Sequence, residues 1–471
     1  MKAPTRSVVK VPARSVVKAP ADSAVRASPR SAAGTFLAGA GGRLLPASLP
    51  LRFFGSAVVF HAWAWVALLL GAEAWPGWRG GLGWPLAALH LITLGTLLSC
   101  AIGASLQLLP VATRQPLRSQ RLMAVLWWAH VPGVALLALG MGRAEPLWMA
   151  AGAAAVLGAL AVFGALLALN LRGARGMPGV VLHGWGALAA LGLLGFSAVA
   201  LVALWLGRPL LDTAAARGLH LLAGAFGFMG LLVFGLAYVL LPMFALAGAP
   251  DERQQVASGS AAIVAIALAV AAEVAAVFGA APTLLRLAGV AAGALALALH
   301  LRLMRQALAT GMRRDFGRAL VLMRIGWGSL ALALLLALAL ALGAPAEILG
   351  RLFGITVIGG WLLSFLFGVL QRILPFLAAM HAAQGHKQGH GRGQRRPPTP
   401  SALTLDPPLA WHLLCHVAAL GLLAAATVTA SATLTAAAAW VGLAGALSFG
   451  VFLAVLMWRL RRARIDGGPP S

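Results

Sequence analysis

Charged residues are scarce in this sequence. Only 10% of its 471 residues are Asp, Glu, Lys or Arg, whereas 61% are hydrophobic and the mean hydropathy is +0.90. Water-soluble domains carry about 25% charged residues. Several uncharged stretches reach the roughly 20 apolar residues that a helix needs to cross a bilayer. This composition excludes a soluble globular protein and predicts an all-α integral membrane protein in contact with the lipid bilayer.

Acidic residues and cysteines are scarcer still. The chain has 11 acidic against 36 basic side chains, which gives a net charge of +25. Nucleic-acid-binding proteins usually gather such charge on one soluble face. Here the basic residues lie in both tails and in alternate loops, so we expect no nucleic-acid partner. The two cysteines, Cys100 and Cys415, lie in apolar runs and provide no disulfide framework.

The chain divides into tails and one large transmembrane domain. Residues 1–48 form a basic, low-complexity tail of degenerate octapeptides, which predicts disorder. The transmembrane domain covers residues 49–461, contains a His/Arg/Pro-rich loop at 381–408, and is followed by a tail at 462–471. About twelve helices are predicted. Their expected ranges are 51–73, 81–111, 121–142, 147–171, 179–206, 217–247, 257–281, 283–306, 318–342, 349–379, 409–428 and 431–459.

Loop charges orient these helices. One side carries most of the arginines, among them Arg114, Arg172, Arg253, Arg313 and Arg396, together with both tails. The other side carries fewer basic residues, with acidic residues near them. The positive-inside rule therefore predicts both termini in the cytoplasm of a cell with the protein in its inner membrane. An even number of helices agrees with this orientation.

A short pattern recurs three times along the chain. It consists of Gly103–Pro110, Gly235–Pro242 and Gly368–Pro375, with glycine-to-glycine separations of 132 and 133 residues. A second motif lies one helix earlier in each case: His61-Ala-Trp63, His183-Gly-Trp185 and Ile325-Gly-Trp327. Such periodicity predicts three four-helix repeats, at about 49–175, 176–310 and 315–461. The glycines favour close helix approach, and the prolines mark places where a helix break is tolerated.

Histidines within the predicted spans are candidate ligands, because ionisable residues in a membrane are costly. His90 and His220 lie 20 and 22 residues before their repeat prolines. Their depths therefore differ by about 3 Å, toward the external side. Neutral imidazole can ligate iron, copper or zinc. The alternative is a hydrogen bond to a backbone carbonyl. His61 and His183, at matching places in the odd-numbered helices, are weaker candidates for cofactor binding.

Other ionisable residues allow two interpretations each. His412 and His416 are spaced i, i+4 on one helix face, so they could chelate a metal or act at the helix end. His130 and His300 are isolated in the sequence and are expected to be structural. Glu273, the only acidic residue near the middle of a predicted span, is either a proton relay or a residue at a helix end.

The chain resembles subunit I of the heme-copper oxidases and nitric oxide reductases in its twelve helices, cytoplasmic termini and threefold repeat. His220–Phe228 followed by Gly235–Phe244 is similar to the H…GW…G…Y…LPMF signature of a divergent bacterial group of oxidase subunit I-like proteins. Trp361–His381 is similar to that group's W…S…G…K-I-x-PFL segment. The resemblance covers about residues 51–460 and implies an oxidase-like helical bundle.

The ligand set implied by this resemblance is incomplete. Helix 2 of the oxidases supplies an axial ligand of a low-spin heme and helix 6 a copper ligand, positions to which His90 and His220 correspond. Residues 351–370 and 257–281 lack the histidines expected on helices 10 and 7. The single tyrosine, Tyr238, lies 18 residues after His220 and does not match a redox-active tyrosine beside copper. We expect no standard oxygen- or nitric oxide-reducing centre.

These observations lead to one main hypothesis and two alternatives. The main hypothesis is a relative of oxidase subunit I that binds a b-type heme, copper or another single metal. It would work in electron transfer, nitric oxide handling or metallocentre assembly, with a respiratory or electron-transfer protein as partner. The alternatives are a transporter of a small solute or metal ion, and a non-catalytic respiratory assembly subunit.

Overall fold

The fold was analysed in a computed structural model, which describes residue 46 and residues 48–115, 119–388 and 398–465. Within these ranges the secondary structure is helical and contains no strand. Twelve helices are long and apolar enough to cross a membrane. The prediction of a multi-pass, all-α membrane protein is confirmed. The predictions for residues 1–45, for the middle of the 381–408 loop and for residues 466–471 lie outside the described residues.

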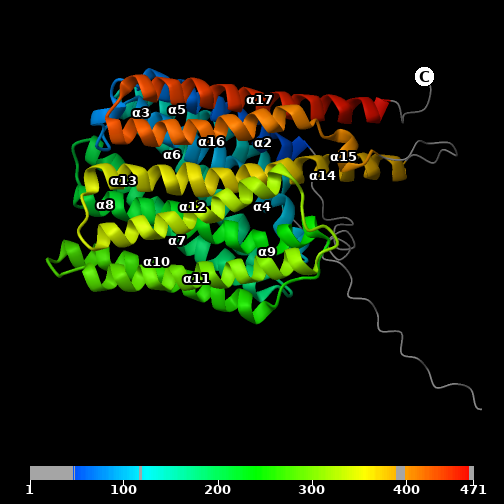
Figure 1. The fold of residues 1–471 in the computed structure, drawn as a ribbon, viewed down its shortest axis with the longest axis horizontal. Coiled ribbons are helices and arrows are strands. Elements are labelled where there is room, and N and C mark those ends of the chain that lie inside the picture. The colour runs from blue at the N-terminus through cyan, green and yellow to red at the C-terminus, as the bar shows by residue number, and fades with distance from the viewer. Residues whose placement is uncertain (1–45, 47, 116–118, 389–397, 466–471) are drawn as a thin grey trace, which may run out of the picture.

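Nine of the twelve spans are single helices, and three are interrupted by a π-helical segment. Figure 1 shows how the helices are arranged. The single helices are α2 (Ser48–Leu70), α5 (Gln120–Gly142), α6 (Pro146–Arg172), α7 (Pro178–Trp205), α10 (Glu252–Val277), α11 (Thr283–Thr310), α12 (Arg318–Ala341), α16 (Asp406–Thr429) and α17 (Ala432–Ile465). The interrupted spans are α3–η2–α4 (Trp84–His90, Leu91–Leu98, Ser99–Ala112), α8–η3–α9 (Thr213–Leu221, Leu222–Gly230, Leu231–Ala245) and α13–η4–α14 (Ala346–Ile355, Thr356–Leu363, Ser364–Gln388). Short helices η1 (Trp75–Gly77) and α15 (Pro400–Leu403) lie in connections.

Several helices begin earlier than hydropathy predicts. α10 begins at Glu252 rather than near residue 257 because the side chain of Asp251 accepts a hydrogen bond from the amide of Gln254. α8 begins at Thr213 because Asp212 accepts from the amides of Ala214 and Ala215. Carboxylate caps satisfy the free amides of a first turn, so polar residues extend these helices beyond their apolar stretches.

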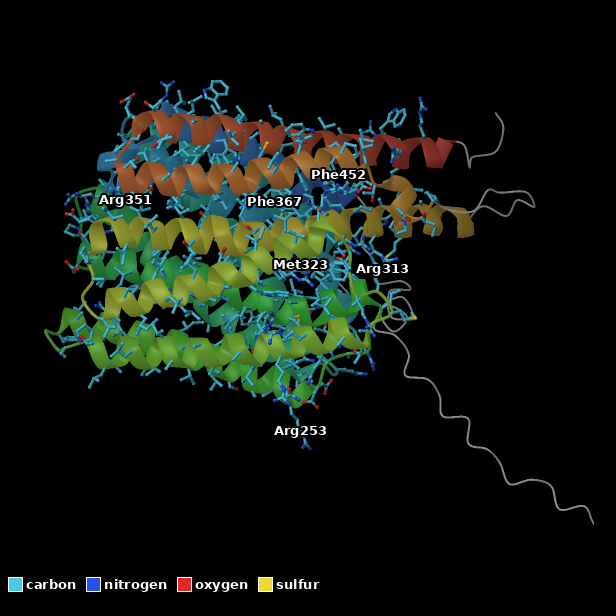
Figure 2. The ribbon with its side chains drawn as sticks, in the orientation of Figure 1. Arg253, Arg313, Met323, Arg351, Phe367 and Phe452 are labelled. Carbon is cyan, nitrogen blue, oxygen red and sulfur yellow. The ribbon has the colours of Figure 1, made fainter. Side chains whose placement is uncertain are left out.

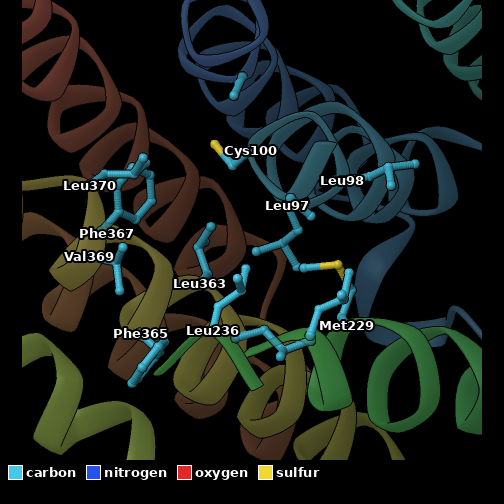
Figure 3. Packing of buried hydrophobic residues seen from close by; sticks show 14 of the residues in the cluster. Leu97, Leu98, Cys100, Met229, Leu236, Leu363, Phe365, Phe367, Val369 and Leu370 are labelled. Carbon is cyan, nitrogen blue, oxygen red and sulfur yellow. The ribbon is translucent and has the colours of Figure 1, made fainter. Parts of the chain in front are cut away.

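The three interrupted spans form the inner part of the molecule. In the most apolar window of α8–η3–α9, 89% of residues are buried, and 67% are buried in each of the other two, against 6–50% in the nine single helices. The segments η2 and η3 both contact η4. Figure 3 shows Leu97, Met229, Leu236 and Leu363 from these spans converging in the core. The inner spans therefore hold the side chains most shielded from lipid.

The remaining helices surround this inner group. α5 packs against α6, α10 against α11, and α16 against α17, each as an antiparallel pair. The first span, α2, also contacts the last span, α17. The helices therefore form a closed bundle in which the first and last spans meet.

Glycines permit the close packing of each inner span on the span before it. A methyl group added at any of the three motif glycines would meet atoms of the preceding span at 3.1 Å or less, which is tighter than ordinary van der Waals contact. The contacts are Gly103 with Phe53 Cβ at 3.1 Å, Gly235 with His183 Cβ at 2.8 Å and Gly368 with the Ala319 carbonyl oxygen at 2.7 Å. Small residues allow helix backbones to approach in this way.

The irregular turns of the inner spans lie away from the prolines. α4, α9 and α14 continue past Pro110, Pro242 and Pro375. The irregularity is instead a π-helical segment upstream in each span. His90 directly precedes η2, and His220 lies two residues before η3. A π-helical turn changes the direction of side chains along a helix and often marks a functional position.

The two ends of the bundle differ in charge. Figure 2 shows Arg313 toward one end of the bundle, Arg351 at the other, and Met323 and Phe367 between them. We call the first the basic end and the second the opposite end. Large apolar side chains are exposed along the lateral surface, for example Trp128 and Trp440. In α10 only 6% of the spanning window is buried. These lateral faces suit contact with lipid tails.

Candidate functional site

His90 and His220 come from different inner spans and meet in one place. Their ring centroids are 6.3 Å apart with an interplanar angle of 31°. His90 lies at the end of α3, directly before η2, and His220 in the last turn of α8, two residues before η3. The similar depth of the two residues was predicted from their spacing to the prolines. Their lateral proximity, which the sequence did not show, places both on the wall of one pocket.

Hydrogen bonds fix the same tautomer in both rings. His90 Nδ1 is 3.0 Å from the Leu86 carbonyl oxygen, which can only accept, so this nitrogen carries the proton. The Ser197 hydroxyl donates to the Leu194 carbonyl at 3.0 Å. Ser197 Oγ therefore accepts from His220 Nδ1, at 3.3 Å. Both Nε2 atoms are left with a free lone pair and no partner among the described residues. A histidine held through Nδ1 in this way presents Nε2 as a ligand.

The two imidazoles line an apolar pocket of about 340 Å³. Its walls include Met141, Met149 and Phe228, and Arg217 lies at its edge. A second pocket of about 770 Å³ adjoins it and shares Arg217 and other residues with it. Pockets of this size, apolar with few polar groups, are typical of ligand and cofactor sites.

Three arginines line the larger pocket at the opposite end of the bundle: Arg79, Arg217 and Arg351. Arg351 Nη1 donates to the carbonyls of Trp75 at 3.1 Å and Pro76 at 2.6 Å. Arg217 Nη1 donates to the Arg79 carbonyl at 3.0 Å. These bonds tie the 75–80 loop to α8 and α13. Arg79 itself pairs with Glu347 at 3.0 Å, so the pocket has an excess of positive charge.

His61 belongs to a second cluster, between α2, α14 and α16. Its ring centroid is 6.3 Å from that of His412, which is 5.8 Å from that of His416. The ring of Phe367 lies among them, 4.7 Å from His61 and 4.4 Å from His412. Trp65 Nε1 donates to His61 Nε2 at 3.1 Å. His412 and His416 are thus core residues rather than residues at a helix end.

His183 belongs to a third cluster, with Tyr238 and His300. His183 Nδ1 donates to the Gly179 carbonyl at 2.7 Å, and its ring centroid is 5.4 Å from that of Tyr238. The Tyr238 hydroxyl is 3.2 Å from His300 Nδ1. His300 also stacks on Phe234 at 4.0 Å. His300 was expected to be isolated; helix rotation and a contact 62 residues away in sequence bring it to the only tyrosine.

His130 and Glu273 each have a local partner. His130 Nε2 is 3.1 Å from Ser99 Oγ, and its structural role stays a prediction. Glu273 Oε1 is 3.1 Å from Arg286 Nη2, across the α10–α11 pair. Glu273 lies in the last turns of α10, which ends at Val277. The ion pair explains this carboxylate without proton transfer, and its role as a proton relay stays a prediction.

Many buried ring nitrogens in these clusters have no hydrogen-bond partner. They include Nδ1 of His61 and His416, both nitrogens of His412, and Nε2 of His183 and His300. Each unpaired buried polar group costs about 1–3 kcal/mol. Across the described ranges, no three His, Cys, Asp or Glu side chains converge to hold a metal ion as they stand. The sequence signal for these clusters was weak, because depth can be counted along a helix but the direction of a side chain cannot.

No protein-family model and no curated protein matches the chain.

Proposed function

We propose that this protein is a membrane-embedded b-type heme protein that works in electron transfer, with His90 and His220 as the heme ligands. The observation that carries the proposal is the pair of imidazoles with free Nε2 atoms on one apolar pocket. Hydrogen bonds from Nδ1 hold both rings in the tautomer that a metal requires. The proposal rests on this donor set.

The separation of the rings fits two ligands of one metal. Metal–imidazole bonds of about 2.0–2.1 Å place the centroids of two opposed rings about 6 Å apart, close to the observed 6.3 Å. Arg79, Arg217 and Arg351 supply positive charge for the carboxylates of heme. The imidazoles of His90 and His220 are neutral ligands, so they bring no charge of their own into the apolar interior, where an uncompensated charge is costly.

Heme supplies one-electron redox chemistry when it is bound. If both His90 and His220 held the heme, it would supply one-electron redox chemistry, which favours electron transfer over nitric oxide handling. The Leu86 carbonyl and Ser197 orient the ligands, while Met149 and Phe228 exclude water. An electron-transfer function requires a redox partner, and we propose a respiratory protein.

We also propose a threefold four-helix repeat and an oxidase subunit I-like bundle. The π-helical segments support the repeat, because each lies at a similar distance before its motif glycine. A second set of glycines, Gly95, Gly227 and Gly360, lies eight residues before the first set, and each packs on the preceding span. The oxidase resemblance would assign His90 and His220 to two centres. Their location on one pocket makes the proposed centre a different one.

An absorption spectrum of the detergent-purified protein, oxidised and reduced, tests the proposal. We expect a Soret band and reduced-heme bands that disappear in His90→Leu and His220→Leu. His130→Gln, which changes a histidine outside the pocket, is the matched control and should retain heme. Absence of heme from the wild-type protein after expression with ample heme would refute the proposal. Retention of low-spin heme by the His90→Leu/His220→Leu double variant would refute the assignment of ligands.

The larger pocket supports a second candidate function, transport of a small anionic solute. Three arginines from separate elements line its 770 Å³ at the opposite end of the bundle. Flux of an organic anion into proteoliposomes, lost on Arg351→Gln and independent of His90, would favour this function. Twelve-helix transporters more often consist of two related halves, so the proposed three-part repeat argues against it.

A further inference from the structure

Three arginines lie within the spans of the α11–α12 hairpin and not in its connecting loop. Arg302 and Arg305 belong to α11 and Arg324 to α12, and all three side chains are exposed. At the basic end α11 ends at Thr310 and α12 begins at Arg318. Arg302 is eight residues and Arg324 six residues from these helix ends, which corresponds to depths of about 12 and 9 Å. Arginines that only set topology lie in the loops.

Helix length places these arginines near the boundary between headgroups and hydrocarbon. α11 has 28 residues and α12 has 24, so the helices are about 42 and 36 Å long. For centred helices, a hydrocarbon core of about 30 Å leaves about 6 and 3 Å beyond it at each end. Arg302 and Arg324 therefore leave their helices at the same depth, about 6 Å inside the hydrocarbon edge. A long side chain at this depth extends toward the headgroups.

The three guanidinium groups have no counter-ion within the described part of the chain. No ion pair or hydrogen bond is formed by the side chain of Arg302, Arg305 or Arg324 with any described residue. Arg286, on the same α11 but at the opposite end, pairs with Glu273 at 3.1 Å. An unpaired arginine at membrane depth is costly. An anionic group from outside the chain would therefore stabilise the hairpin surface.

The adjoining residues at the basic end add further uncompensated positive charge. The guanidinium carbon of Arg372 on α14 lies 5.8 Å from the ring centre of Phe316, in the α11–α12 connection, and its Nε is buried without a hydrogen-bond partner. Asp315 already accepts from the backbone amide two residues later, and Asp406 is 3.8 Å from Arg318. The excess of positive charge on this surface attracts anions.

Apolar side chains continue from the arginines toward the middle of the membrane. Leu295 lies seven residues before Arg302, and Leu335 lies eleven residues after Arg324. These separations are nearly whole numbers of helical turns, so each leucine shares a helix face with its arginine. Both leucines are exposed. A cationic group above an apolar strip matches a phospholipid, whereas a soluble anion would leave the strip uncovered.

We propose that Arg302, Arg305 and Arg324 form a binding site for an anionic phospholipid in the leaflet at the basic end. The headgroup phosphate would lie on the neighbouring helices α11 and α12, with acyl chains along Leu295 and Leu335. Guanidinium groups bind phosphate oxygens through paired hydrogen bonds, and basic clusters between transmembrane helices bind anionic headgroups. A zwitterionic lipid is disfavoured because its own cation competes with the arginines. The inference is independent of the proposed heme function.

Titration of the delipidated, full-length protein with phosphatidylglycerol or phosphatidylcholine, followed by native mass spectrometry, tests the proposal. We expect tighter binding of phosphatidylglycerol to the wild type. Its affinity should fall about fivefold in Arg324→Gln and at least about 25-fold in Arg302→Gln/Arg305→Gln/Arg324→Gln, because each arginine near an anionic headgroup contributes about a fivefold factor. Arg461→Gln/Arg462→Gln removes two exposed charges from the end of α17. This matched control should keep wild-type affinity.

Measurements on the wild type keep the proposal open to refutation if a variant does not fold. Added salt should weaken the binding of phosphatidylglycerol and leave that of phosphatidylcholine unchanged. An excess of inorganic phosphate should not displace the lipid, and displacement would assign the site to a soluble phosphate instead. Equal affinity of the wild type for the two lipids would overturn the proposal. Undiminished binding of phosphatidylglycerol by the triple variant would also overturn it.

Discussion

At the scale of single residues, the partner of Nδ1 decides what a buried histidine can do. In His90 and His220 the Nδ1–H donates a hydrogen bond to a carbonyl and to a serine hydroxyl respectively, which leaves Nε2 free. In His130 the bonded nitrogen is Nε2 instead. His90 and His220 are therefore left with Nε2 unpaired, whereas the unpaired nitrogen of His130 is Nδ1. These second contacts tune metal affinity as strongly as many direct ligands do.

Ser197→Ala tests this orienting role. Loss of the hydroxyl frees His220 to rotate and to change tautomer, so we expect heme affinity to fall about 10-fold. Heme titration of the apoprotein, followed by its Soret absorption, measures the change. Ser99→Ala removes the equivalent partner of His130 and should leave heme affinity unchanged. Equal affinity of wild type and Ser197→Ala would show that Ser197 does not orient the ligand.

Glu273 and Arg286 offer a second residue-scale test. Arg286 is 40% exposed, so solvent screens the pair. Glu273→Gln should therefore lower the free energy of unfolding by only about 0.5 kcal/mol. Thermal unfolding in detergent measures this, and the charge-reversed variant Glu273→Arg/Arg286→Glu should recover most of the loss. Loss of the proposed electron-transfer activity in both Glu273→Gln and the charge-reversed variant would favour a proton relay over a purely structural ion pair.

At the scale of elements, the inner spans combine glycines and π-helical segments. The glycines bring each inner span against the span before it, and the π-helical turns follow the residues that face the pocket. In a regular helix successive side chains are rotated by about 100° around the axis. A π-helical turn has a different rotation per residue, so it shifts the face on which the following side chains lie. His90 and His220 each lie shortly before one of these turns, and their ring centroids are 6.3 Å apart.

Gly368→Ala should destabilise the protein because its new methyl group would lie 2.7 Å from the Ala319 carbonyl oxygen and 3.1 Å from the Met323 amide nitrogen. Backbone atoms cannot move aside as a flexible side chain can, so we expect a loss of about 1–3 kcal/mol. Gly421→Ala, with no atom within 4 Å of the new methyl group, is the matched control. It should be neutral or stabilising by up to about 1 kcal/mol. A common unfolding temperature for both variants would contradict the packing argument.

At the scale of the whole molecule, the bundle has one basic end and lateral faces that suit lipid. Arg313 lies at the basic end and Arg351 at the opposite end (Figure 2). α2 and α17 contact each other, so no open seam is left between the first and last spans. The pocket with the three arginines lies at the opposite end. The larger of the two pockets described above therefore lies at the end away from Arg313.

Cysteine accessibility in whole cells tests the orientation of these ends. In a Cys100→Ala/Cys415→Ala background, a membrane-impermeant maleimide should label Arg351→Cys in intact cells. It should label Arg313→Cys only after permeabilisation, because the positive-inside rule places the basic end in the cytoplasm. Labelling in the reverse order would refute the predicted topology.

The sequence by itself determined the membrane-spanning helices and the depth of their histidines. Apolar length and rise per residue are local properties, which is why the twelve predicted ranges agree with the observed helices to within several residues. The early starts of α8 and α10 depended on the caps Asp212 and Asp251, which hydropathy does not register.

Only the tertiary structure decided which histidines meet. His90 joined His220, while His61 joined His412 and His416 instead of His183. The π-helical turns were also not predicted, although the prolines in the same helices were identified in the sequence. Both outcomes depend on the rotation of helices about their axes and on which spans lie side by side. Those properties are set by the packing of distant segments, and no single apolar helix encodes them.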